Sequence, residues 1–120
     1  MNSQVLVIED EKALSELVRI NLKLRGFSVS VANSGEEGLK LAQETEPGLI
    51  LLDVRLPDID GWDICKKLKN SEGGWVPYIV FLTAATQKKD KEMATEAGGD
   101  GFLEKPFEIS ELLNLVKQFV

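Results

Sequence analysis

Residues 47–53 read Pro47-Gly48-Leu49-Ile50-Leu51-Leu52-Asp53 and contain the most apolar run of the chain. An unbroken apolar run of this length is typical of a strand that is buried on both faces of a parallel sheet. Pro47-Gly48 stops any preceding helix, and residues 57–61, which begin with proline and end with glycine, form a predicted loop. We therefore predict a central strand over residues 49–52, with the carboxylate of Asp53 at its end.

Four other short segments also have the apolar content of strands, and they alternate with longer segments of helical period. The runs are residues 5–8, 28–32, 78–82 and 101–104, and the helical segments are residues 13–24, 34–44, 88–97 and 108–120, with one more around Ile64, Cys65 and Leu68. Such alternation predicts an α/β fold with a parallel sheet. Residues 28–32 alternate polar and apolar and should form an edge strand. We predict a single domain over residues 1–120: a five-stranded parallel sheet of order 2-1-3-4-5 with five helices on both faces.

Composition excludes several classes of function. The chain has 14 basic and 20 acidic residues, a net charge of −6, and such an acidic domain should not bind nucleic acid directly. No apolar run approaches the roughly 20 residues that span a membrane, and no signal-peptide pattern begins the chain. One cysteine, Cys65, allows no disulfide framework, so we expect a cytoplasmic protein. The chain has no histidine, which excludes a Ser-His-Asp triad.

Polar side chains follow four of the predicted strands and should meet at one edge of the sheet. They are Glu9 and Asp10 after the first strand, then Asp53, Thr83 and Lys105. Ligands of open parallel sheets bind outside the carboxyl ends of the strands. Three carboxylates at one point need a cation or a proton, and oxygen ligands without histidine or cysteine suit Mg²⁺. A lysine and a hydroxyl beside that cation indicate a phosphoryl site, with Asp53 as the carboxylate nucleophile.

The chain resembles the receiver domain of two-component response regulators, a flavodoxin-like phosphoacceptor domain, over essentially its whole length. The resemblance is carried by the order and spacing of four motifs: Val5-Leu6-Val7-Ile8-Glu9-Asp10-Glu11, Leu51-Leu52-Asp53-Val54-Arg55-Leu56-Pro57-Asp58-Ile59-Asp60-Gly61, Phe81-Leu82-Thr83-Ala84 and Lys105-Pro106-Phe107. It implies a regulatory domain that assists its own phosphorylation and dephosphorylation and is not an enzyme. It also implies a cis peptide bond between Lys105 and Pro106.

The resemblance assigns a role to each residue of the predicted site. Asp53 would accept a phosphoryl group from the phosphohistidine of a sensor histidine kinase or a histidine phosphotransfer protein. Mg²⁺ would be held by Glu9, Asp10, Asp53 and the backbone carbonyl of Arg55. Thr83 and Lys105 would bind the phosphoryl oxygens, and Phe102 would be the switch aromatic that turns inward when Thr83 moves. The face formed by the fourth helix, fifth strand and fifth helix would then change for a downstream effector domain or protein.

Two departures from the family pattern carry predictions of their own. The positions two residues beyond Asp53 and Thr83 flank the phosphoryl group in the family, and here they are Arg55 and Ala85. Neither side chain can orient an attacking water as a carboxylate or amide can, so we predict a long-lived phosphorylated form. The last predicted helix carries Lys117 as its one cation, whereas some DNA-binding regulators dimerise through arginines on this helix. We therefore expect a monomer or a weak dimer.

Other interpretations remain beside this one. A phosphatase of the haloacid-dehalogenase type also uses an aspartate nucleophile, but its general acid would fall at Arg55. A flavodoxin-like cofactor carrier would bind the phosphate of its cofactor at the first loop, but here that loop is Glu9-Asp10-Glu11, which repels phosphate. A pseudo-receiver would act as an interaction module alone. Outside the site we expect Asp60 to cap the third helix, Asp58 to be a solvated loop residue, and Trp62 and Cys65 to be core residues.

Overall fold

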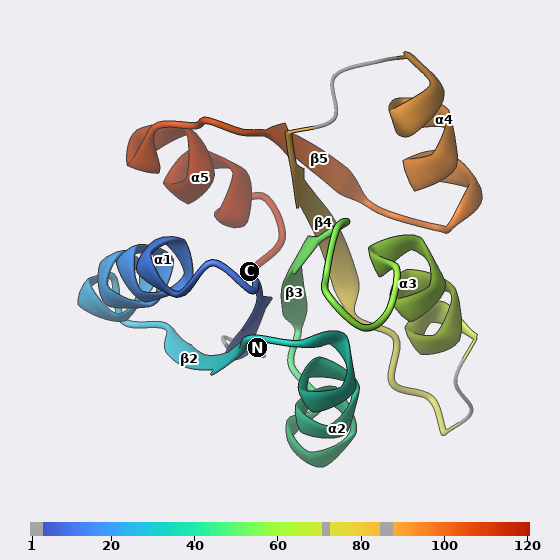
Figure 1. Ribbon diagram of the computed structural model, residues 1–120. Coiled ribbons are helices and arrows are strands. Elements are labelled where there is room, and N and C mark those ends of the chain that lie inside the picture. The colour runs from blue at the N-terminus through green and yellow to red at the C-terminus, as the bar shows by residue number, and fades with distance from the viewer. Residues whose placement is uncertain (1–3, 71–72, 85–87) are drawn as a thin grey trace.

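The computed structural model describes residues 4–70, 73–84 and 88–120, and within these ranges five strands alternate with five helices (Figure 1). Ala85 lies outside the described residues. It is one of the two residues predicted to flank the phosphoryl group. The elements are β1 (Gln4–Ile8), α1 (Lys12–Leu24), β2 (Ser28–Ala32), α2 (Gly35–Thr45), β3 (Leu49–Asp53), α3 (Gly61–Lys69), β4 (Tyr78–Thr83), α4 (Lys88–Glu96), β5 (Gly101–Glu104) and α5 (Ile109–Val116).

The strands form one parallel sheet of order β2-β1-β3-β4-β5, which confirms the predicted topology. β3 lies at the centre and is buried along its whole length, as its unbroken apolar sequence predicts. β2 and β5 form the edges, and both are partly exposed. The register pairs Ile8 with Leu52 and Asp53 with Leu82, so β1, β3 and β4 end at nearly the same level.

Helices cover both faces of the sheet, as predicted. α1 and α5 pack on one face, where Val18, Leu22, Leu112 and Val116 meet the side chains of alternate strand residues. α2, α3 and α4 cover the other face, whose core includes Ala42, Ile64, Leu68 and Ala94. Trp62 and Cys65 lie in this second core, and the Trp62 ring meets Phe81 at a centroid distance of 4.7 Å. The prediction that these two residues serve packing is confirmed.

The ends of the helices follow local capping chemistry. The Ser34 hydroxyl accepts a hydrogen bond from the amide of Glu37 at 3.2 Å, and the Asp60 carboxylate accepts one from the amide of Trp62 at 3.0 Å. The cap formed by Asp60 confirms the sequence-based prediction. The last helix is shorter than predicted: α5 begins at Ile109, after the capping box of Glu108 and Glu111, and ends at Val116. Within the described ranges, the helices are too short or too polar to span a bilayer.

Candidate functional site

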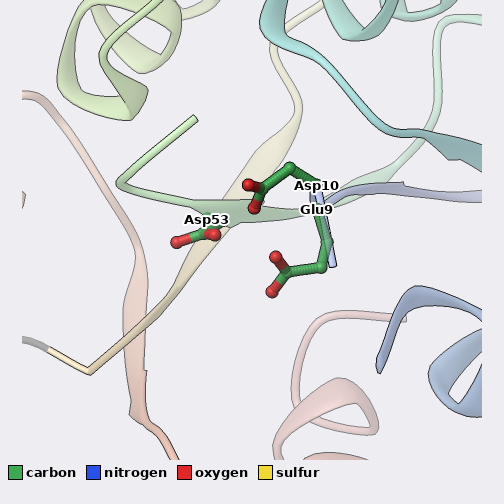
Figure 2. A group of neighbouring side chains, drawn as sticks. All are labelled: Glu9, Asp10 and Asp53. Atoms are coloured by element: carbon green, nitrogen blue, oxygen red, sulfur yellow. The ribbon is translucent and has the colours of Figure 1, made fainter. Parts of the chain in front are cut away.

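Three carboxylates meet at the carboxyl end of the sheet (Figure 2). Glu9 and Asp10 directly follow β1, and Asp53 is the last residue of β3. Because β1 and β3 are neighbours in register, one oxygen from each carboxylate lies within 4.8 Å of the others. Glu9 is 1% exposed and Asp53 is 6% exposed, whereas Asp10 faces solvent. The sequence-based prediction that these three side chains converge is confirmed.

Lys105 supplies positive charge to the same point. It follows β5, and its Nζ contacts Oε1 of Glu9 and lies 3.4 Å from Oδ2 of Asp53. Burial raises the pKa of Glu9; the contact with Lys105 lowers it in part, Asp53 raises it further, and the result is about 7. For Lys105, burial acts to lower the pKa, but the carboxylates of Glu9 and Asp53 outweigh it and raise that pKa. The site therefore holds more negative than positive charge.

This donor set fits a magnesium ion. Mg²⁺ prefers carboxylate and carbonyl oxygens at about 2.0–2.1 Å, so oxygens on opposite sides of the ion are about 4.2 Å apart. The carboxylate oxygens already lie within 4.8 Å of one another, so small rotations of exposed Asp10 and of Glu9 would complete the approach. The loop after β3 adds polar backbone: the amide of Arg55 donates to Oδ1 of Asp53 at 3.2 Å. This bond also fixes the orientation of the Asp53 carboxylate.

The other predicted site residues occupy two different places. Thr83 ends β4, is 1% exposed, and its carbonyl accepts a hydrogen bond from the amide of Lys105 at 2.8 Å. It therefore lies at the same rim as Asp53, one strand away. Phe102 lies inside β5, opposite Phe81, and packs half-buried against the core under α3 and α4. The Lys105–Pro106 peptide bond is cis, as predicted.

Two residues near the site make contacts that the sequence does not predict. Asp58 is an exposed loop residue, as predicted, and its carboxylate also accepts hydrogen bonds from the amides of Gly35 at 2.8 Å and Glu36 at 2.9 Å. These bonds, first that of Glu36, lower the pKa of Asp58. Nδ2 of Asn33 donates to the carbonyl of Glu9 at 2.8 Å. Both partners are backbone groups more than twenty residues away, which no local pattern signals.

Known proteins share this sequence pattern. A family model described as the response regulator receiver domain matches residues 5–117. The DNA-binding dual master transcriptional regulator RpaA of Synechocystis sp. is 39% identical over 114 residues, which are 95% of this chain and 47% of that protein. The alkaline phosphatase synthesis transcriptional regulatory protein PhoP of Bacillus subtilis is 39% identical over 117 residues, 98% of this chain and 48% of that protein. The chain thus spans about half the length of these curated relatives.

Solved structures share the fold. The chemotaxis response regulator CheY4 of Vibrio cholerae superposes with a TM-score of 0.92 and 27% identity, and the match covers 100% of both chains. The response regulator DrrB of Thermotoga maritima gives a TM-score of 0.88 and 29% identity over 99% of this chain and 52% of that one. Fold, rim residues and sequence relatives agree: the chain belongs to the response regulator receiver domains, the regulatory signalling domains of two-component systems that are phosphorylated on an aspartate.

Proposed function

We propose that Asp53 is the phosphoacceptor of this receiver domain. The observation that carries the proposal is the position of its carboxylate: it ends the buried central strand, lies beside Glu9 and Asp10, and is 3.4 Å from Nζ of Lys105. In the transfer, an Asp53 oxygen forms a bond to phosphorus. The bond between phosphorus and the imidazole nitrogen of a partner's phosphohistidine breaks, and the imidazole keeps the electron pair.

The surrounding residues would offset the charge of this step. Receiver domains bind Mg²⁺ in their acidic pocket, and here Glu9, Asp10, Asp53 and the Arg55 carbonyl would hold it. The ion would neutralise negative charge that otherwise repels the incoming phosphoryl group. Lys105 would exchange its contact with Glu9 for one with a phosphoryl oxygen, and the Thr83 hydroxyl would bind another. The existing contacts of Lys105 with two site carboxylates support this role.

Phosphorylation would act by shifting an equilibrium between two states. Thr83 and Lys105 would bind the added oxygens in one state only, and movement of Thr83 would let Phe102 turn further inward. Phe102 is half-buried and belongs to β5, the edge strand that pairs with β4, so it is suited to this role. About 5.5 kcal/mol of differential binding moves a population from 1:99 to 99:1.

The proposed partners are those that the family suggests. Receiver domains of response regulators interact with histidine kinases and effector domains. For this chain we propose a sensor histidine kinase or a histidine phosphotransfer protein as donor. We propose an effector domain or protein that reads the face of α4, β5 and α5 as the output.

The test is to treat the protein with Mg²⁺ and a small acyl phosphate and to map the modified residue by mass spectrometry after reductive trapping. We expect modification of Asp53 that is lost in Asp53→Asn and when a chelator removes the metal. Asp63→Asn is the matched control, because it removes an exposed carboxylate from the next helix. A folded wild-type protein that stays unmodified, or is modified elsewhere, would contradict the proposal and favour a pseudo-receiver.

A further inference from the structure

Residues 33–36, which include the connection from β2 and the first two residues of α2, contact both loops that carry the predicted metal ligands. On one side, Nδ2 of Asn33 donates to the carbonyl of Glu9 at 2.8 Å and to Oγ of Ser15 at 3.2 Å. On the other side, the first two amides of α2 donate to the two carboxylate oxygens of Asp58, at 2.8 and 2.9 Å. The segment therefore bridges the loop after β1 and the loop after β3.

The contact between α2 and the second loop is close as well as hydrogen-bonded. A Cβ added at Gly35 would lie 3.0 Å from Cβ of Ile59 and 3.1 Å from Oδ1 of Asp58. A side chain here would require the loop or its side chains to shift by a few tenths of an ångström, so glycine suits this close approach. A carboxylate is suited to this place because the amides at a helix N-terminus attract negative charge.

The loop after β3 is itself stiff. The amide of Gly61 donates to the carbonyl of Val54 at 2.8 Å, and Arg55 and Asp60 form an antiparallel bridge. A Cβ at Gly61 would lie 2.5 Å from the carbonyl oxygen of Asp53, so the two ends of the loop are in direct contact. Because the loop is closed in this way, a bond that holds Asp58 also holds Arg55.

We propose that Asn33 and Asp58 are positioning residues of the magnesium site, and that together they fix the spacing between its two ligand-bearing loops. Neither side chain touches the ion. Asn33 holds the backbone of Glu9, Asp58 holds the loop of Arg55, and α2 joins them. The inference rests on the metal site proposed above. It adds that this site depends on two residues that follow neither β1 nor β3 directly and that supply no ligand.

Calorimetric titration of the unphosphorylated protein with Mg²⁺ tests the proposal. Groups that orient metal ligands typically change affinity by about 10–100-fold, and less direct ones should change it less. We expect Asn33→Ala and Asp58→Ala each to weaken Mg²⁺ binding about three- to tenfold. Because the two bonds act in series, the double variant should bind about as weakly as the weaker single variant.

Two matched controls separate positioning from simpler effects. Ser34→Ala removes the other N-cap bond of α2 without touching the loop of Arg55, so it reports helix destabilisation alone. Glu36→Gln changes the net charge as Asp58→Ala does, and the backbone amide of residue 36 still donates to Asp58. Both controls should bind Mg²⁺ within about twofold of wild type. If Asp58→Ala failed to fold, Asp58→Asn keeps one acceptor and should give an intermediate affinity.

Amide hydrogen exchange supplies a second measurement that does not depend on the metal. Without Mg²⁺, residues 54–60 should exchange faster in Asp58→Ala than in Ser34→Ala. The proposal is overturned if Asn33→Ala and Asp58→Ala bind Mg²⁺ like wild type, or if Ser34→Ala weakens binding equally. If wild-type protein binds Mg²⁺ and is modified on Asp53, but the variants bind Mg²⁺ equally well, the positioning role is refuted and the proposed function stands. Wild-type protein that does neither refutes the proposed function too.

Discussion

At the scale of single residues, the site brings together like charges that the fold must hold in place. Glu9 and Asp53 are buried, and Lys105 is the cation that faces both. One ammonium group offsets only part of the charge of two buried carboxylates and exposed Asp10. The same arrangement that costs stability without metal provides the attraction for a divalent cation. Binding and stability should therefore be linked in this protein.

The raised pKa of Glu9 predicts how metal-free stability depends on pH. The pKa rises from an ordinary 4.5 to about 7 in the folded state, so between these values the folded protein holds a proton that the unfolded chain releases. The stabilisation is complete below the lower value and is lost as pH rises through the upper one. Urea unfolding without Mg²⁺ should show this loss in wild type, and Glu9→Gln should flatten it. Equal pH profiles for the two proteins would refute the assignment.

The flank of Asp53 predicts a slow loss of phosphate. The side chain of Arg55 is exposed and has no oxygen with which to orient an attacking water. We expect the phosphoryl group on Asp53 to persist for minutes or longer after the donor is removed. Arg55→Asn, which introduces an amide, should shorten this lifetime, and Arg55→Lys should not. The lifetime is measured by following the modified mass over time, and a wild-type value of seconds would contradict the prediction.

At the scale of elements, apolar runs predicted the strands well but missed some of their terminal residues. Polar Gln4, Asp53 and Thr83 belong to strands because their backbones continue the ladder, a property that hydrophobic pattern does not report. The last helix was predicted four residues too long at its end, because apolar Phe119 and Val120 continue the pattern after the helix ends.

The rim of the site was predictable for a different reason. Glu9, Asp53 and Lys105 each lie at the carboxyl end of a strand, and parallel strands bring such residues together whatever the side chains are. Asn33 and Asp58 were not predictable, because their roles depend on backbone groups that only the packed structure brings near. Phe102 could be placed in a strand from its neighbours, whereas its packing beneath α3 and α4 required the structure.

The approach of α2 to β1 gives a prediction about packing. A Cβ at Gly38 would lie 2.6 Å from Cδ1 of Ile8, which is fully buried. We expect Gly38→Ala to lower the free energy of unfolding by about 1–3 kcal/mol through overpacking. Ile8→Val removes the nearest atom, so the double variant should lose less than the two single losses combined. Chemical denaturation measures all three variants, and strict additivity would show that this contact is not the cause.

At the scale of the whole molecule, the state of association can be predicted from α5. The helix Ile109–Val116 contains no lysine or arginine in its sequence, and Lys117 follows its end. A charged dimer contact through this helix would lack its cations, so we expect a monomer in light scattering without phosphate. Raised ionic strength should leave the mass unchanged. A stable dimer that dissociates in salt would contradict this expectation and would indicate a charged dimer contact on a face other than that of α5.

The two tryptophans lie at opposite ends of the sheet, and this has a practical consequence. Trp75 donates its indole N–H to the carbonyl of Pro47, before β3 begins, whereas Trp62 lines a hollow shared with Arg55 and Asp58 beyond its end. A Trp75→Phe protein would therefore keep one tryptophan, beside the loop that the chemistry must disturb. Its emission would record events at the rim in real time, with no dye attached and no partner present.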